Sequence, residues 1–477
     1  MIKIVDKYKN MSLPLKAALW FTLCQFIQKG IGMLTTPIFT RLLSTEEYGR
    51  TSAFLSWADI VIPIITLSAW RGMMNLYSKD KNKDEVLSSV ICLSAVISCL
   101  WMFLVMCVSK YALFVTGFTF PLLVFLLIYG FSQNIFYAWT VRMQYEYKYK
   151  PLVIVTIIYT VVSSVGGAVI VCFFSHTAEA KVIPQVLTLA IIVIMIILVS
   201  FQKKNVLFNK EIWLFSLRFA IPLIPHYLSE VILQSADRIM INSMCGTSDV
   251  AVYSIAYSVG SLIALITSAV NSAFSPYQYQ KIKSKDYKGL SRTTTAVIAF
   301  VGVCLCGLML FGREIVLIFG GQKYIESISL IIPICLGVFF NYVFQLFARV
   351  QEYYEQKHTI VIASVSCAIL NVVLNFIFIK MYGYQAAAYT TFVCYFAFCF
   401  LHYLFYRKAC IKNIGHEIYD IKGLILISAV LIAISPLFSI LSQYYIVKYL
   451  LLVIVLCIAA AFRKRIISFI KNMREGK

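Results

Sequence analysis

Ionisable side chains inside long apolar segments are the residues of this chain whose chemistry most needs an explanation. A charged group in such a segment is costly unless it faces a cavity or a partner, so it marks a candidate binding or ion pathway. Cations with N–H donors suit an anionic group such as a phosphate. The cations and acids in these positions are Lys29, Arg71, Arg218, Arg238, Asp59, Glu230 and Asp237.

The deepest of these cations, Lys29, belongs to a polar stripe. Gln25, Gln28, Lys29, Gly32 and Thr36 fall within an arc of roughly 100° if the segment is a helix. The internal repeat described below places His226 at the position that matches Lys29. We therefore predict a cation-lined substrate cavity formed by Lys29, Arg71, Arg218, His226 and Arg238.

Each of these cations also has a local interpretation, which stays open. Arg71 and Arg218 lie near the ends of their segments and could extend to the membrane surface. His226 follows Pro225 and could bond to kinked backbone, and Arg238 could pair with the adjacent acid.

The acids allow two roles. Asp59, Glu230 and Asp237 either pair with the cations or carry coupling ions, and we favour pairing.

Catalytic chemistry has no visible basis in the sequence. There is no nucleophile–base pair, metal-ligand set or phosphate-binding glycine loop, and most of the 14 cysteines lie within apolar runs, where thiols act as small apolar groups. We expect no enzyme activity, no catalytic residue, no bound metal and no cofactor. Coupling to a gradient of H⁺ or Na⁺ stays open.

Composition defines the elements that must position these side chains. The chain has 477 residues, of which 61% are hydrophobic and 13% charged. This is too few polar side chains to cover a soluble globule. The net charge of +21 could suggest nucleic-acid binding, but no hydrophilic domain exists to carry a basic face. An all-α polytopic membrane protein is the expected class, with the bilayer rather than nucleic acid as its partner.

The apolar runs predict about fourteen spans of the length a bilayer requires. Proline residues at positions 37, 63, 222, 225 and 276 lie within or at the ends of some of them, where they can break helices. The expected spans are residues 13–40, 48–76, 86–109, 112–141, 152–174, 182–201, 212–241, 250–275, 293–311, 328–348, 359–379, 384–406, 423–442 and 446–462.

Basic residues orient these spans. An even number of spans places both termini on one side, and the dense basic clusters fall on that side. They lie at residues 79–83, 203–210, 281–288 and 463–465. The positive-inside rule assigns that side to the cytoplasm, so both termini are expected there.

A weak repeat divides the chain. The segment RLLSTEEYG at residues 41–49 has a counterpart at residues 238–251, and basic segments follow both, at an offset of roughly 200 residues. An even number of helices between the copies makes the repeat parallel. We predict a six-helix bundle at 1–205, a second at 206–410, and two further helices with a basic tail at 411–477.

These segments resemble a known family. Residues 41–49, residues 237–258, the IFGGQKYIES run at 318–327 and the YGYQAAAYT run at 382–390 are similar to signatures of bacterial polysaccharide-unit flippases of the Wzx type. Those proteins belong to the multidrug/oligosaccharidyl-lipid/polysaccharide (MOP) exporter superfamily, which also contains the MATE transporters. Two positions depart from the pattern, since Ala251 and Gln385 stand where glycine is expected.

The resemblance implies a function. The implied protein is a flippase that moves undecaprenyl-pyrophosphate-linked oligosaccharide across the bacterial cytoplasmic (inner) membrane by alternating access. The oligosaccharide would be used to build a surface polysaccharide, either capsule or the O-antigen of lipopolysaccharide. A polysaccharide polymerase and a chain-length regulator are implied partners. Two alternatives remain: a MATE-like drug/cation antiporter or other lipid-precursor flippase, and a membrane polymerase, which the short loops disfavour.

Overall fold

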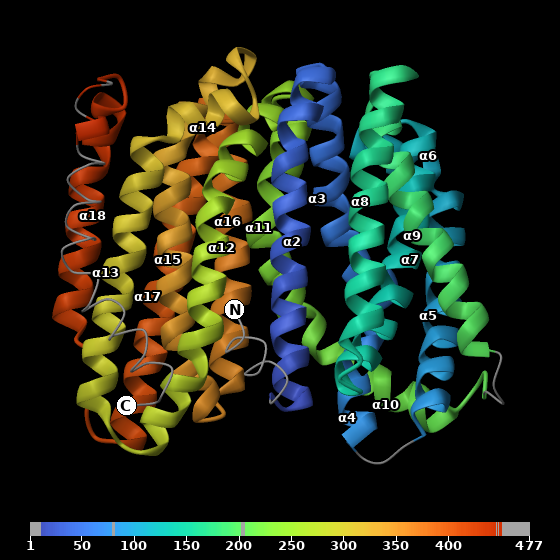
Figure 1. Ribbon diagram of the computed structural model, residues 1–477, viewed down its shortest axis with the longest axis horizontal. Coiled ribbons are helices and arrows are strands. Elements are labelled where there is room, and N and C mark those ends of the chain that lie inside the picture. Colours follow the sequence, from blue (N-terminus) through green and yellow to red (C-terminus); the bar gives the residue numbers. More distant parts are fainter. Residues whose placement is uncertain (1–10, 79–81, 202–205, 445, 447, 451–477) are drawn as a thin grey trace, which may run out of the picture. The chain divides into compact units, whose positions relative to one another are not determined.

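The computed structural model describes residues 11–78, 82–201, 206–444, 446 and 448–450, and all regular structure in this part of the chain is helical (Figure 1). Of the described helices, 10 are long and apolar enough to cross a membrane, and a bent pair raises this to 11. The prediction of an all-α polytopic membrane protein is confirmed.

The helices form two compact units, Met1–Ala251 and Val252–Lys477, which we call unit 1 and unit 2. Unit 1 holds α2 (Leu13–Leu42), α3 (Thr45–Thr66), η1 (Ala69–Gly72), α4 (Met73–Ser78), α5 (Lys83–Cys107), α6 (Ser109–Thr116), α7 (Phe120–Tyr145), α8 (Tyr149–Phe173), α9 (Ala178–Phe201), α10 (Lys210–Ala220), η2 (Ile221–Leu223) and α11 (Ile224–Met244).

The boundary between the units falls within α12 (Thr247–Lys283). Unit 2 continues with α13 (Tyr287–Leu310), α14 (Gly312–Phe319), η3 (Gln322–Ser327), α15 (Ile328–Tyr353), α16 (Lys357–Tyr382), α17 (Ala386–Asn413) and α18 (Ile421–Leu441). Within it, α15 packs along α17, and α13 packs against α18 (Figure 1).

Each predicted span from 13–40 to 423–442 corresponds to a helix or to helices joined by a short break. The last one, 446–462, falls almost entirely outside the described residues, as do most of the basic positions at 79–83, 203–210 and 463–465. Neither α2 nor the α10–α11 segment is among the helices apolar enough to count as spans. These two segments carry most of the predicted polar residues.

A local order of helices recurs in the two units. In each unit a long helix is followed by a short one and then by two more long helices: α5, α6, α7 and α8 in unit 1, and α13, α14, α15 and α16 in unit 2. Tyr147 follows α7 and Glu355 follows α15, with φ of 53° and 57°. This left-handed conformation is unusual for non-glycine residues, so its recurrence indicates that the two turns are built alike.

One span is sharply broken. The segment that continues α3 is bent by 62° from it. Leu67 and Ser68, which form the break, both have left-handed backbone, with φ of 45° and 48°. Pro63 precedes the break, and Pro222 and Pro225 accompany the 3₁₀ turn between α10 and α11, because proline removes a helical donor. The predicted prolines Pro37 and Pro276 instead lie inside continuous helices.

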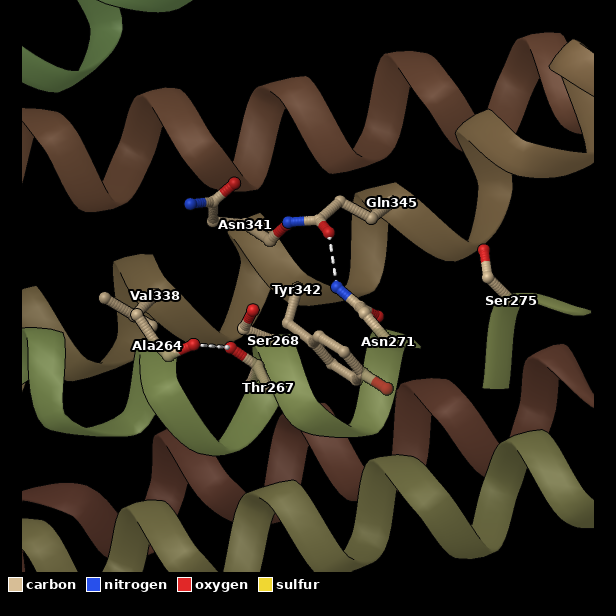
Figure 2. A pocket seen from close by; sticks show the side chains of 9 residues that line it. All are labelled: Ala264, Thr267, Ser268, Asn271, Ser275, Val338, Asn341, Tyr342 and Gln345. Atoms are coloured by element: carbon tan, nitrogen blue, oxygen red, sulfur yellow. Dashed lines mark hydrogen bonds between the residues drawn. The ribbon is translucent and has the colours of Figure 1, made fainter. Parts of the chain in front are cut away.

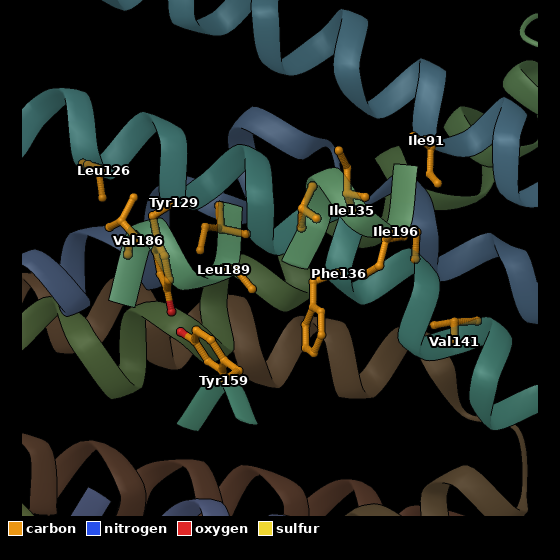
Figure 3. Close-up of a cluster of buried hydrophobic side chains, with 14 of the residues drawn as sticks. Ile91, Leu126, Tyr129, Ile135, Phe136, Val141, Tyr159, Val186, Leu189 and Ile196 are labelled. Carbon is orange, nitrogen blue, oxygen red and sulfur yellow. The ribbon is translucent and has the colours of Figure 1, made fainter. Parts of the chain in front are cut away.

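The core of unit 1 is apolar and aromatic. Side chains from α3, α5, α7 and α9 interlock there, including Leu126, Ile135, Val186 and Leu189, which are almost completely buried (Figure 3). Because lipid is itself apolar, close packing rather than water exclusion stabilises such helix contacts. This packed framework holds the polar residues described next.

Candidate functional site

Unit 1 contains a polar cavity. Its volume is about 350 Å³, and side chains from α2, α3, α7, α8 and α9 line it. Gln28, Gly32 and Thr36 of the predicted stripe on α2 are among the lining residues. The lining contains one charged residue, Lys181, which the sequence analysis did not select. The predicted span 182–201 begins one residue after it, whereas α9 begins at Ala178.

The Lys181 ammonium lies among aromatic and hydroxyl groups. Its Nζ is 4.7 Å from the centroid of the Phe39 ring and 4.6 Å from that of Tyr48. It also donates a hydrogen bond of 3.3 Å to Thr51 Oγ1. No carboxylate of the described residues forms an ion pair with it. The rings stabilise the cation but leave its charge uncompensated.

A hydrogen-bonded group of amides and phenols forms another part of the wall. The Tyr129 hydroxyl accepts hydrogen bonds from Gln133 Nε2 at 2.7 Å and from Gln185 Nε2 at 3.2 Å. The hydroxyls of Tyr129 and Tyr159 point toward each other (Figure 3). Gln185 lies one helical turn after Lys181, so both side chains face the cavity.

The segment at residues 41–49 builds this side of the cavity. Ser44 caps α3 by accepting a hydrogen bond from the Glu47 N–H at 3.1 Å. Glu47 in turn accepts one from the N–H of Ala178 at 2.6 Å, which fixes the start of α9 and hence the place of Lys181. Tyr48 then supplies a ring to the ammonium. A motif noted for its resemblance therefore has a physical role.

Gly49, which ends this motif, permits a close backbone contact. A Cβ at this position would lie 1.7 Å from the carbonyl oxygen of Thr247, so no other residue fits without movement of the backbone.

Two predicted residues lie close together on α3 and α11. Ser235 donates a hydrogen bond of 3.1 Å to Oδ2 of Asp59. Arg238 lies near enough to interact electrostatically with Asp59 and with Tyr48. Pairing of Asp59 with a cation stays a prediction.

Arg71 directly follows the break after α3. Its guanidinium carbon lies 3.6 Å from the centroid of the Tyr227 ring and 4.6 Å from that of Trp70. Its buried Nε has no hydrogen-bond partner. The break thus places a stacked guanidinium with an unused donor inside unit 1.

The remaining predicted residues occupy varied positions. Lys29 and Arg218 are exposed in the structure, and neither lines the unit 1 cavity. His226 Nε2 lies 3.8 Å from Glu230 Oε1, one turn along α11. Asp237 is 1% exposed.

Unit 2 contains a cavity of a different kind (Figure 2). Side chains of α12 and α15 line a volume of about 460 Å³, and all of them are neutral. Asn271 Nδ2 donates a hydrogen bond of 2.7 Å to Gln345 Oε1, and Tyr342 has a buried hydroxyl without a partner. The described residues contain no group of acids, histidines and cysteines arranged to hold a metal ion.

Comparison with known proteins provides two family matches. The family described as polysaccharide biosynthesis protein matches residues 15–280, and the family described as MatE matches residues 222–377. No curated protein matches the sequence.

Among solved structures, the lipid II flippase MurJ in an inward closed conformation is similar, with a TM-score of 0.68 and 16% identity over 94% of this chain and 100% of that chain. A multidrug resistance MATE family transporter of the MOP superfamily, in an inward-facing conformation, has a TM-score of 0.66 and 13% identity over 81% of this chain and 96% of that chain. A MOP superfamily transporter from Pyrococcus furiosus, whose binding pocket is described as reversed in polarity, has a TM-score of 0.57. Its identity is 13% over 84% of this chain and 97% of that chain. These likenesses establish the fold.

Proposed function

Because this chain belongs to the polysaccharide biosynthesis protein family and has the fold of MOP transporters, we propose that it is a flippase for lipid-linked oligosaccharides. Its cargo is an oligosaccharide unit on an undecaprenyl-pyrophosphate carrier, moved across the bacterial cytoplasmic membrane for a surface polysaccharide such as O-antigen or capsule. Both termini face the cytoplasm. The likeness to a lipid II flippase supports a lipid-linked cargo.

One observation carries this proposal: unit 1 holds cations without carboxylate partners in its polar interior. Lys181 faces only rings and a hydroxyl, and Arg71 has an unused buried donor. Cations within the membrane that lack partners attract anionic cargo, and a lipid-linked oligosaccharide is anionic through its pyrophosphate and through any acidic sugar. The polyprenyl tail needs no polar path, since it can stay in lipid.

The mechanism that suits this fold is alternating access. The head group enters from the cytoplasm, meets the cations and aromatic walls, and leaves toward the opposite leaflet. Coupling to an H⁺ or Na⁺ gradient through Asp59, Glu230 or Asp237 is part of the proposal, as is hand-over to a polymerase and a chain-length regulator.

Charge reversal tests the role of the exposed cations. Lys29→Glu and Arg218→Glu should each abolish translocation, because they would repel the pyrophosphate, while the protein still inserts in the membrane. Each variant is expressed in cells from which the native gene has been deleted. The measurement is the leaflet in which lipid-linked glycan accumulates. Lys110→Glu, an exposed lysine on α6, is the matched control and should keep activity. Full activity in both reversals would overturn the assignment of these cations.

The MatE family match supports an alternative, a drug/cation antiporter. An antiporter would export a cationic dye when an ion gradient is imposed, and would not redistribute lipid-linked glycan. Dye export by reconstituted protein, with no change in glycan leaflet on gene deletion, would favour it.

A further inference from the structure

We propose that the unit 1 cavity binds a carboxylate-bearing sugar of the transported glycan, with Lys181 as the counter-ion of the carboxylate. This inference rests on the proposed function, because it concerns the part of the cargo that the cavity receives. It names a substrate class that the family membership leaves open.

The charge of the cavity indicates an anion. Lys181 is the one charged side chain in its lining, and the described residues offer it no carboxylate. A desolvated ammonium without a counter-ion is costly, and aromatic rings offset only part of that cost. A ligand that brings one negative charge completes the site.

The number and type of cations indicate a single charge. A pyrophosphate carries more than one charge and is best bound by guanidinium groups, which offer paired donors. The cavity lining contains no arginine and one lysine. A carboxylate matches this lining better than the carrier's pyrophosphate does, so the two anionic parts of the cargo would use different cations.

The walls suit a sugar ring. A volume of about 350 Å³ is at the small end of the range for small-molecule pockets. The side-chain amides of Gln133 and Gln185 each donate one N–H to Tyr129, and their carbonyl oxygens are suitable acceptors for sugar hydroxyls. The rings of Tyr48 and Tyr159 supply flat walls with polar edges, as sugar binding requires.

The cavity has an access route on unit 1 itself. Three of its lining residues, Gln28, Gly32 and Leu55, are exposed, Leu55 by 38%. Lys29 follows Gln28 directly and is also exposed. An anionic sugar would therefore meet Lys29 near the entrance before it reaches Lys181.

Ligand binding to the purified full-length protein tests the proposal. D-glucuronate, D-glucose, D-glucuronamide and acetate are added separately, and the thermal unfolding temperature is followed as a function of concentration. We expect glucuronate to stabilise the protein at concentrations at least about tenfold lower than glucose or glucuronamide, because a charge-assisted contact is lost with the neutral sugars. Glucuronamide has nearly the same shape, so it isolates the charge without any mutation.

Variants then place the effect at Lys181. Lys181→Met should weaken glucuronate binding by about tenfold or more, Lys181→Arg should keep most of it, and Lys110→Met should leave it unchanged. Equal stabilisation by glucose and glucuronate would overturn the proposal in favour of neutral sugars, and equal stabilisation by acetate would overturn it in favour of any small carboxylate. No stabilisation by any of the four would also overturn it.

These outcomes are separate from those of the proposed function. The binding experiment contains no lipid carrier and no transport step. A protein that flips its cargo but ignores glucuronate refutes only the sugar assignment, and a protein that binds glucuronate but leaves glycan leaflets unchanged refutes only the flippase.

Discussion

The cavities of the two units differ in charge although both units contain the same order of a long, a short and two long helices. In unit 1, a lysine without a carboxylate partner lies between two rings beside a group of amides and phenols. In unit 2, the cavity between α12 and α15 contains only neutral groups, and its strongest contact is the bond between Asn271 and Gln345. The comparison suggests that one cavity binds a charged ligand while the other holds helices together, since side-chain amides are frequent links between membrane helices.

The helices beside these cavities also differ. The second helix of unit 1, α3, is broken after Thr66, whereas its counterpart α12 runs without interruption from Thr247 to Lys283. The break places Arg71 inside unit 1. Discontinuous helices with irregular backbone are typical of substrate sites in transporters, so both differences agree with the proposed recognition of charge by unit 1.

The largest effect that tests this asymmetry is expected at Gly49. Gly49→Ala should destabilise the protein by about 3 kcal/mol, because its Cβ would collide with the Thr247 carbonyl and overpacked contacts of this kind cost 1–3 kcal/mol or more. The matched position in the second copy already holds Ala251, and Ala251→Gly should cost only about 1 kcal/mol through helix propensity. Thermal unfolding in detergent measures both, and equal effects would contradict the difference between the two copies of the motif.

A smaller effect is expected in the unit 2 cavity. Gln345→Leu removes the bond from Asn271 and should destabilise the protein by about 1 kcal/mol, as for other hydrogen bonds between membrane helices. If this cavity is structural, the concentration of glucuronate that stabilises the variant should equal that for the unchanged protein. A shift of that concentration would show that unit 2 contributes to binding.

The smallest effect is expected at the break itself. Ser68 has left-handed backbone, so Ser68→Gly should stabilise the protein by about 0.5–1 kcal/mol. In the continuous helix α12, Ser258→Gly should destabilise it by about 0.5 kcal/mol. A loss of stability in Ser68→Gly would mean that the serine side chain, rather than the backbone, holds the break.

Much of the fold follows from the sequence for a simple reason. A spanning helix must satisfy its own backbone and face lipid, so a long apolar run leaves few alternatives. Pro63 and the pair Pro222 and Pro225 likewise indicated where helices would break. The bend angle of 62° and the left-handed Leu67 and Ser68 were not predictable, because tertiary packing rather than local propensity holds them.

The site was less predictable. Lys181 stands at the edge of an apolar run, where a hydropathy argument assigns it to a loop. The bond from Ala178 N–H to Glu47 extends α9 by a turn and brings the lysine inside, and no local pattern shows such a contact between distant residues. The available signal for the site was the four-residue spacing of Lys181 and Gln185, which places both side chains on one face of a helix. Asp59 was identified from its type alone, while its partner Ser235 was not.

The Lys181 ammonium and the two rings beside it also determine which ligands the cavity would reject. The rings offset part of the cost of desolvating a protonated lysine, by about 2 kcal/mol. A second cation within about 4 Å would be repelled by about 4 kcal/mol, which corresponds to a roughly thousandfold lower occupancy. If the unit 1 cavity receives the cargo, quaternary amines and cationic dyes, which aromatic walls alone would attract, should therefore be excluded from it, whereas the antiporter alternative requires that they bind.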